Sequence, residues 1–153
     1  MGRGAEFDLI RRLRERWGTL AVGLGDDAAI LDVPRGERLV ATTDTAEERV
    51  HFRRQWLSLE EIGYRAVTAA LSDVAAMAPE PRGILVAIAA PPDARDDILA
   101  LGDGIGDAVK SAGTVILGGN LSQAAAFSIT SASLSNVAMP SRNTMSSTLP
   151  MKM

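Results

Sequence analysis

The chain has 153 residues, a formal net charge of -3 and no cysteine. The lack of cysteine excludes disulfides, thiolate metal sites and a cysteine nucleophile, and the scattered basic residues disfavour a nucleic-acid partner. The longest apolar run, residues 84–92, is too short to span a bilayer, so we expect a cytoplasmic protein without a membrane partner.

The first predicted element is an amphipathic helix. Phe7, Ile10, Leu13 and Trp17 recur at steps of three and four residues, while the intervening positions are mostly charged. Gly18 follows the last apolar residue and is a typical helix terminator.

A hairpin is predicted next. Two aliphatic and β-branched runs, residues 28–33 and 38–43, flank the turn residues 34–37. Antiparallel pairing would bring the start of the first run beside the end of the second. The polar side chains expected at that sheet edge are Asp26, Asp27, Thr42, Thr43 and Asp44. Clustered carboxylates repel one another unless a hard cation lies among them, so the hairpin predicts a magnesium site.

The middle of the chain predicts a loop and then a helix. Residues 45–57 have no clean period and are typical of an exposed active-site loop or of a solvated connection. Ser58 and Glu61 form a capping box in front of an apolar, alanine-rich stripe, and prolines end the helix. Asp73 lies in its last turns, where the helix dipole disfavours an acid. A functional role for Asp73 and simple solvation remain open at this point.

The rest of the chain alternates strands with a helix. Residues 83–90 are apolar on both faces, residues 96–112 predict a helix, and residues 115–117 form a short strand running into Gly118-Gly119-Asn120. Residues 127–134 alternate weakly and predict a last strand. The order indicates an α/β sandwich, a mixed sheet with helices packed on one face.

Each polar motif is ambiguous by itself. The Gly-x-Gly-Asp-Asp sequence is typical of turns, Thr42-Thr43-Asp44 of a strand end, and Gly118-Gly119 of either a bend or a phosphate-binding loop. His51 is a single histidine in a polar loop, where solvation is the common case. Together, the carboxylates and the glycine loop match phosphoryl transfer, which depends on Mg²⁺ neutralisation and positioning.

Four ordered motifs resemble the N-terminal domain of thiamine-monophosphate kinases: VGLGDDAA, ATTDTAEERVHF, LSDVAAMAPEPRG and VILGGN. That family belongs to the superfamily of aminoimidazole ribonucleotide synthetase, selenophosphate synthetase and a hydrogenase maturation protein. The resemblance covers about residues 5–122. It implies the fold of that superfamily's N-terminal domain, a homodimer formed through the sheets, and ATP-dependent phosphorylation of thiamine phosphate to thiamine diphosphate.

The resemblance also implies roles for individual residues. Several Mg²⁺ ions would be held by Asp27, Thr42, Thr43, Asp44 and Asp73, with Asn120 as a weaker ligand because family members usually have Asp there. His51 would contact thiamine phosphate. Gly118, Gly119 and Asn120 would lie along the ATP phosphates.

The C-terminal part departs from the family pattern. We expect residues 1–134 to form the ATP- and magnesium-binding domain and the uncharged, Ser- and Met-rich residues 135–153 to form a disordered tail. The family's C-terminal domain is not recognisable, so we expect the chain alone to be inactive or nearly so. The alternatives are another ATP-dependent synthetase of the superfamily and a non-catalytic dimeric domain.

Overall fold

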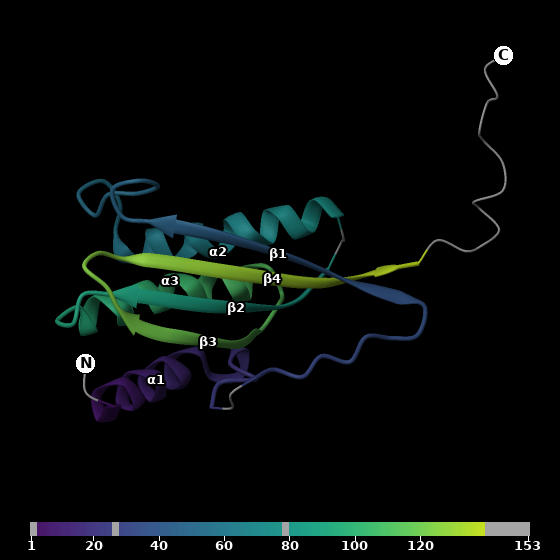
Figure 1. Ribbon diagram of the computed structural model, residues 1–153, viewed down its shortest axis with the longest axis horizontal. Coiled ribbons are helices and arrows are strands. Elements are labelled where there is room, and N and C mark those ends of the chain that lie inside the picture. The colour runs from purple at the N-terminus through teal and green to yellow at the C-terminus, as the bar shows by residue number, and fades with distance from the viewer. Residues whose placement is uncertain (1–2, 26–27, 78–79, 140–153) are drawn as a thin grey trace, which may run out of the picture.

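The computed structural model describes residues 3–25, 28–77 and 80–139. It contains a four-stranded sheet with helices behind it (Figure 1). The elements in chain order are α1 (Arg3–Trp17), the 3-10 turn η1 (Gly18–Leu20), β1 (Glu37–Glu47), α2 (Leu59–Met77), β2 (Pro81–Ala90), α3 (Arg95–Ser111), β3 (Ile116–Gln123) and β4 (Ser128–Ala138). None of the described helices is long and apolar enough to cross a membrane.

The sheet is mixed and its strand order is β1-β4-β2-β3. β4 pairs antiparallel with both β1 and β2, whereas β2 and β3 are parallel and joined by α3. Helices α2 and α3 pack on one face of this sheet, and α1 packs against α3 (Figure 1). The predicted fold class, a mixed sheet with helices on one face, is confirmed.

The predicted first helix is present, but its buried stripe differs from the expected one. Leu9, Leu13 and Trp17 are buried, and the Trp17 Nε1–H donates to the carbonyl of Gly102 on α3 at 2.7 Å. Phe7 is 68% exposed and packs into no core. Leu13 and Trp17 belong both to the predicted stripe with Phe7 and to a second stripe with Leu9. Helix α3 covers the second stripe.

The predictions for α2 and α3 are confirmed. The Glu61 N–H donates to Ser58 Oγ at 3.1 Å and the Ser58 N–H donates to Glu61 Oε2 at 2.8 Å, which completes the capping box. The two helices then cross at very close range. A Cβ on Gly63 would lie 2.1 Å from the Leu101 carbonyl oxygen, and one on Gly104 would lie 1.8 Å from that of Glu60. Only glycine permits this approach at either position.

The predicted hairpin is wrong. Residues 28–33 form no strand and Ile30 is 92% exposed, while β1 pairs with β4 instead. The blue segment of Figure 1 that precedes β1 is extended but runs along the sheet without pairing to it. Alternating β-branched residues suit a strand but do not supply a partner, and β4 provides β1 with a complete ladder.

The last strand is longer than predicted. β4 continues past residue 134 to Ala138, so the first residues of the predicted disordered tail are in the sheet; residues 140–153 lie outside the described part. Ser131, Ser133 and Ser135 are fully buried on the face that α2 covers. Serine weakens the hydropathy alternation of β4, yet its small side chain lets the helix come close to the strand.

The sheet face opposite α2 and α3 is not covered by the described helices, although the segment that contains Ala28, Ala29 and Leu31 borders it. On β2, Ile84, Val86 and Ile88 are buried while Leu85 is 36% exposed, so the helices cover only one of the two apolar faces predicted for this strand. A cavity of about 540 Å³ lies on the open face. Its lining residues are Ala28, Ala29, Leu31, Leu85, Val86, Ala87, Leu117, Gly118, Gly119, Asn120, Thr130, Ala132 and Leu134. We call this surface the open sheet face.

Candidate functional site

Two predicted carboxylates and a hydroxyl lie along the contact between β1 and α2. The Thr42 hydroxyl of β1 donates to Asp73 Oδ2 of α2 at 3.5 Å. Because side chains alternate along a strand, Asp44 shares the helix-facing side of β1 with Thr42, and Thr43 points to the opposite side. The structure therefore places Thr42 beside Asp73 and Asp44 on the same side of β1, whereas Thr43 lies on the other side.

A cavity of about 240 Å³ continues this line toward the end of β1. Its lining residues are Asp44, Thr45, Ala46, His51, Phe52, Leu57, Ile62, Arg65, Ala66 and Ala69. Buried Phe52, Ile62 and Ala66 supply an apolar wall, while Asp44, His51 and Arg65 supply polar groups. We call it the β1–α2 cavity. Such a mixture suits a ligand with an apolar ring and a charged group.

Arg65 is the residue of this cavity that sequence reasoning missed. It lies two helical turns before Asp73 on the same side of α2, with Ala69 between them, as the four-residue spacing dictates. Within the described residues its guanidinium makes no ion pair. An exposed arginine on an amphipathic helix normally indicates a solvated face. In the sequence, the spacing of eight residues between Arg65 and Asp73 is the signal that would have placed both on one side of the helix.

His51 enters the β1–α2 cavity from the turn after β1. Its Nδ1 accepts a hydrogen bond from the Glu47 N–H at 3.0 Å. The turn is closed by the Glu47 carbonyl, which accepts from the His51 N–H at 2.8 Å. His51, predicted from the sequence as a ligand contact, therefore shares a cavity with Asp44.

The two described carboxylates keep free acceptor capacity. Asp44 Oδ1 accepts the Thr45 N–H at 2.8 Å, and neither Asp44 nor Asp73 pairs with an arginine or lysine of the described chain. No group of three or more Asp, Glu, His or Cys residues close enough to hold a metal occurs in residues 3–25, 28–77 and 80–139. Asp26 and the predicted ligand Asp27 lie outside these ranges.

The predicted phosphate-binding glycines are in a strand. The expected loop after residue 117 is wrong, because β3 includes Gly118, Gly119 and Asn120. A Cβ on Gly119 would lie 2.0 Å from the Val86 carbonyl oxygen, so close strand approach explains this glycine. In the strand order, β3 and β1 occupy opposite edges, about 14 Å apart at three strand spacings. Asn120 is therefore separated from Asp44.

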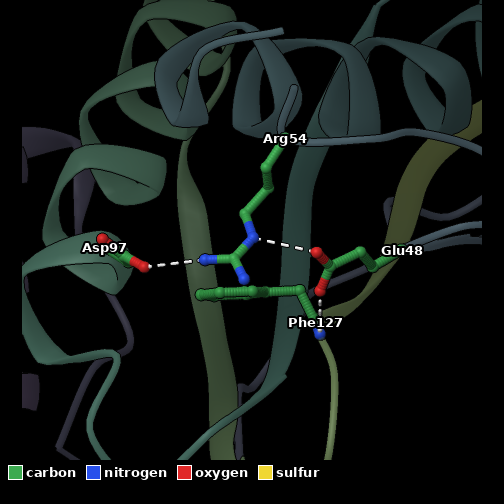
Figure 2. A network of polar contacts seen from close by, with 4 residues as sticks. All are labelled: Glu48, Arg54, Asp97 and Phe127. Atoms are coloured by element: carbon green, nitrogen blue, oxygen red, sulfur yellow. Dashed lines mark hydrogen bonds and ion pairs between the residues drawn. The ribbon is translucent and has the colours of Figure 1, made fainter. Parts of the chain in front are cut away.

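A polar network anchors the turn that carries His51 (Figure 2). Arg54 donates from Nε to Glu48 Oε1 at 2.9 Å and from Nη1 to Asp97 Oδ2 at 3.1 Å, with its guanidinium 5.3 Å from the centre of the Phe127 ring. Glu48 Oε2 accepts the Phe127 N–H at 3.2 Å. Burial opposes ionisation of Glu48, yet the hydrogen bonds from Arg54 and Phe127 keep its pKa below the usual value.

The chain is similar to a known protein family and to individual members of it. The family described as AIR synthase related protein, N-terminal domain, matches residues 25–137. A thiamine-monophosphate kinase of Bacillus subtilis (strain 168) is 35% identical over 119 residues, which are 75% of this chain and 37% of that protein. The chain thus spans little more than a third of this relative's length.

Solved structures give the same likeness. A thiamine-monophosphate kinase from Stenotrophomonas maltophilia K279a superposes with a TM-score of 0.69 at 30% identity, covering 90% of this chain and 43% of that one. AaThiL complexed with AMPPCP and TMP gives a TM-score of 0.65 at 26% identity, covering 87% and 42%. The fold and a part of the length are shared with both.

Proposed function

Because the chain belongs to the family described as AIR synthase related protein, N-terminal domain, we propose that it supplies part of the active site of an ATP-dependent thiamine-monophosphate kinase. The names of the relatives support the reaction, and the AaThiL complex with AMPPCP and TMP supports ATP and thiamine phosphate as ligands. Because the chain spans a minor part of these relatives, the complete reaction is a proposal. Its cytoplasmic location also remains a prediction.

The observation that carries the proposal is the set of oxygen ligands between β1 and α2. Asp73 accepts from Thr42, and Asp44 lies on the same side of β1 as Thr42. In the described part of the chain neither carboxylate forms an ion pair. Transfer of a phosphoryl group needs such carboxylates near a site for the acceptor, because charge spreads over several oxygens in the transition state. The β1–α2 cavity adjoins Asp44 and is lined by both polar and apolar side chains.

The donor set fits magnesium. Mg²⁺ prefers oxygen ligands and takes one or two protein carboxylates, completing its shell with water and phosphate. Asp44 and Asp73 would hold one or more such ions, with the Thr42 hydroxyl beside them; Asp27, Thr43 and the weak ligand Asn120 remain predictions. When bound, Mg²⁺ would neutralise the nucleotide phosphates.

The remaining side chains of the cavity would bind and orient the acceptor. Arg65 offers a fork of N–H donors that matches a phosphate, and His51 offers a second donor from Nε2. Phe52 and its apolar neighbours would exclude water and pack against a heteroaromatic ring. The ATP contacts Gly118, Gly119 and Asn120 remain a prediction, since they lie on the opposite edge of the sheet from Asp44.

Nucleotide binding should depend on magnesium and on the carboxylates of Asp44 and Asp73. In a calorimetric titration with a non-hydrolysable ATP analogue, we expect Asp44→Asn and Asp73→Asn each to weaken Mg²⁺-dependent binding about 10- to 100-fold, since each removes a charged ligand. Asp107→Asn makes the same change at an exposed position of α3 and should leave binding unchanged.

Two results would contradict the proposal. Nucleotide binding that is unchanged by Mg²⁺ and by both substitutions would show that Asp44 and Asp73 are not metal ligands. A folded chain that binds no nucleotide with magnesium present would favour the non-catalytic domain. A superfamily enzyme with a different acceptor would retain Mg²⁺-dependent nucleotide binding but ignore thiamine phosphate in a second titration.

The open sheet face supports a homodimer. Leu85 of β2 and Leu39 of β1 are 36% and 43% exposed, and the cavity of about 540 Å³ on this face is lined mainly by aliphatic side chains. Exposed aliphatic side chains on one face of a sheet favour a protein partner. A second copy of the chain is the partner we propose, in keeping with the family resemblance.

Placing a charge on the open sheet face should dissociate this dimer. We expect Leu85→Glu to shift the chain from dimer to monomer in sedimentation velocity, because a carboxylate would be buried without a partner. Phe7→Glu, an equally drastic change at an exposed residue of α1, is the control and should leave the dimer intact. Monomeric wild-type chain at high micromolar concentration would refute the proposed dimer.

A further inference from the structure

The turn after β1, residues 47–52, is held by several backbone hydrogen bonds although it lies at the surface. The Glu47 carbonyl accepts from the Val50 and His51 N–H groups at 3.2 and 2.8 Å, and the Arg49 N–H donates to the Phe52 carbonyl at 2.7 Å. Arg49 has a φ of 71°, a left-handed conformation that a non-glycine residue adopts only when its surroundings impose it. Buried Phe52 anchors the far end of the turn.

This turn decides which nitrogen of His51 carries the proton. Nδ1 accepts the Glu47 N–H, so in the neutral ring the proton is on Nε2. The same hydrogen bond fixes the orientation of the imidazole ring. His51 lines the β1–α2 cavity together with Asp44 and Arg65. His51 can then act toward a ligand as a neutral hydrogen-bond donor.

The network of Figure 2 holds the turn from its other side. Glu48 is joined to Phe127 twice, because its own N–H donates to the Phe127 carbonyl at 2.9 Å and its carboxylate accepts the Phe127 N–H. Arg54 links that carboxylate to Asp97 in the first turn of α3. The Glu48 side chain is only 11% exposed, so this ion pair is shielded more than an ordinary surface pair.

We propose that Arg54 is a positioning residue: through Glu48 it fixes the turn 47–52, and the turn presents the Nε2–H of His51 to the β1–α2 cavity as a donor for a phosphate monoester. The identity of the ligand rests on the proposed function. The tautomer and its dependence on Arg54 do not, because both are properties of the unliganded chain.

A single histidine makes the proposal directly measurable. His51 is the only histidine in the sequence, so a long-range ¹H–¹⁵N correlation spectrum of the uniformly labelled chain contains one imidazole. At a pH where the ring is neutral, we expect the wild-type chain to show the Nε2–H tautomer alone. In Arg54→Lys and Glu48→Gln, the chemical shifts of both ring nitrogens should move toward the averaged values of a tautomer mixture. In neither variant can residue 54 bond the two carboxylates of Glu48 and Asp97 as the wild-type guanidinium does.

Matched variants separate positioning from general stability. Arg53→Lys alters the neighbouring arginine, which stacks on Trp56 at 5.0 Å and takes no part in the network, and should leave the tautomer unchanged. Asp97→Asn removes only the outer ion pair and provides a milder variant in case Arg54→Lys fails to fold. Folded Arg54→Lys and Glu48→Gln variants that keep a pure Nε2–H tautomer would overturn the proposal, as would an Nδ1–H tautomer in the wild-type chain.

Titration with thiamine phosphate, and with inorganic phosphate as a simpler probe, tests the ligand. We expect the Nε2 signal of the wild-type chain to shift on binding, and Arg54→Lys to bind about five-fold or more weakly. A tautomer that depends on Arg54 without any response to thiamine phosphate would uphold the positioning role and count against the proposed kinase substrate. The two failures are therefore distinguishable.

Discussion

Replacing Gly104 by alanine is expected to lower the free energy of unfolding by about 3 kcal/mol or more. The added Cβ would lie 1.8 Å from the Glu60 carbonyl oxygen and 2.6 Å from its carbonyl carbon. Those atoms belong to the backbone of the first turn of α2, so no side-chain rotation relieves the clash. The two helices must separate, and the loss exceeds the gain of about 1 kcal/mol in helix propensity.

Urea unfolding followed by circular dichroism measures this loss. Gly4→Ala is the matched control, since Gly4 is also in a helix but a Cβ there would meet nothing within 4 Å. We expect the control to be at least as stable as the wild-type chain. Equal midpoints for Gly104→Ala and the wild-type chain would show that the close crossing of α2 and α3 is not required for stability.

Removing the Phe127 ring is expected to cost about 3 to 5 kcal/mol. Phe127 is 1% exposed, belongs to the main core cluster and carries the Arg54 guanidinium over its ring. Phe127→Ala leaves a cavity in that core and removes the platform on which Arg54 lies. The loss should appear as a lower urea midpoint without a change in its cooperative form.

Phe7→Ala is the control for this loss, because the same atoms are removed from a residue that is 68% exposed. Its effect should stay within about 0.5 kcal/mol. A similar loss at both positions would mean that burial of Phe127 contributes little. A much smaller loss at Phe127 would mean that the neighbouring side chains fill the space.

The elements that local sequence determines were predicted correctly. The capping box of Ser58 and Glu61 needs only four residues, and the stripe of α3 needs only the helical period. The predicted hairpin failed because strand pairing is a long-range choice. Residues 28–33 have a suitable pattern, but β1 pairs with a strand about ninety positions later, and no local signal identifies that partner.

Prediction of the site followed the same division. Asp44, Asp73 and His51 were identified from motifs. The structure places Asp44 and His51 in one cavity, and it places Asp73 beside Thr42 on the same side of β1 as Asp44. Arg65 and the Arg54 network were missed because exposed charged residues carry no sign of their distant neighbours. The motif left a bend and a phosphate-binding loop open for Gly119, and the structure places it in β3, where its lack of a side chain permits the close contact with Val86.

The strand order has a consequence for how the chain acquires its structure during synthesis. β4 lies between β1 and β2, so neither the β1 ladder nor the antiparallel half of the β2 ladder exists before residues 128–138 leave the ribosome. Until then, α2 and α3 have only the parallel pair of β2 and β3 to cover. The high contact order of β1 with β4 makes that last pairing slow, and the side of α2 that packs on β1 and β4 stays exposed to chaperones until the pairing forms.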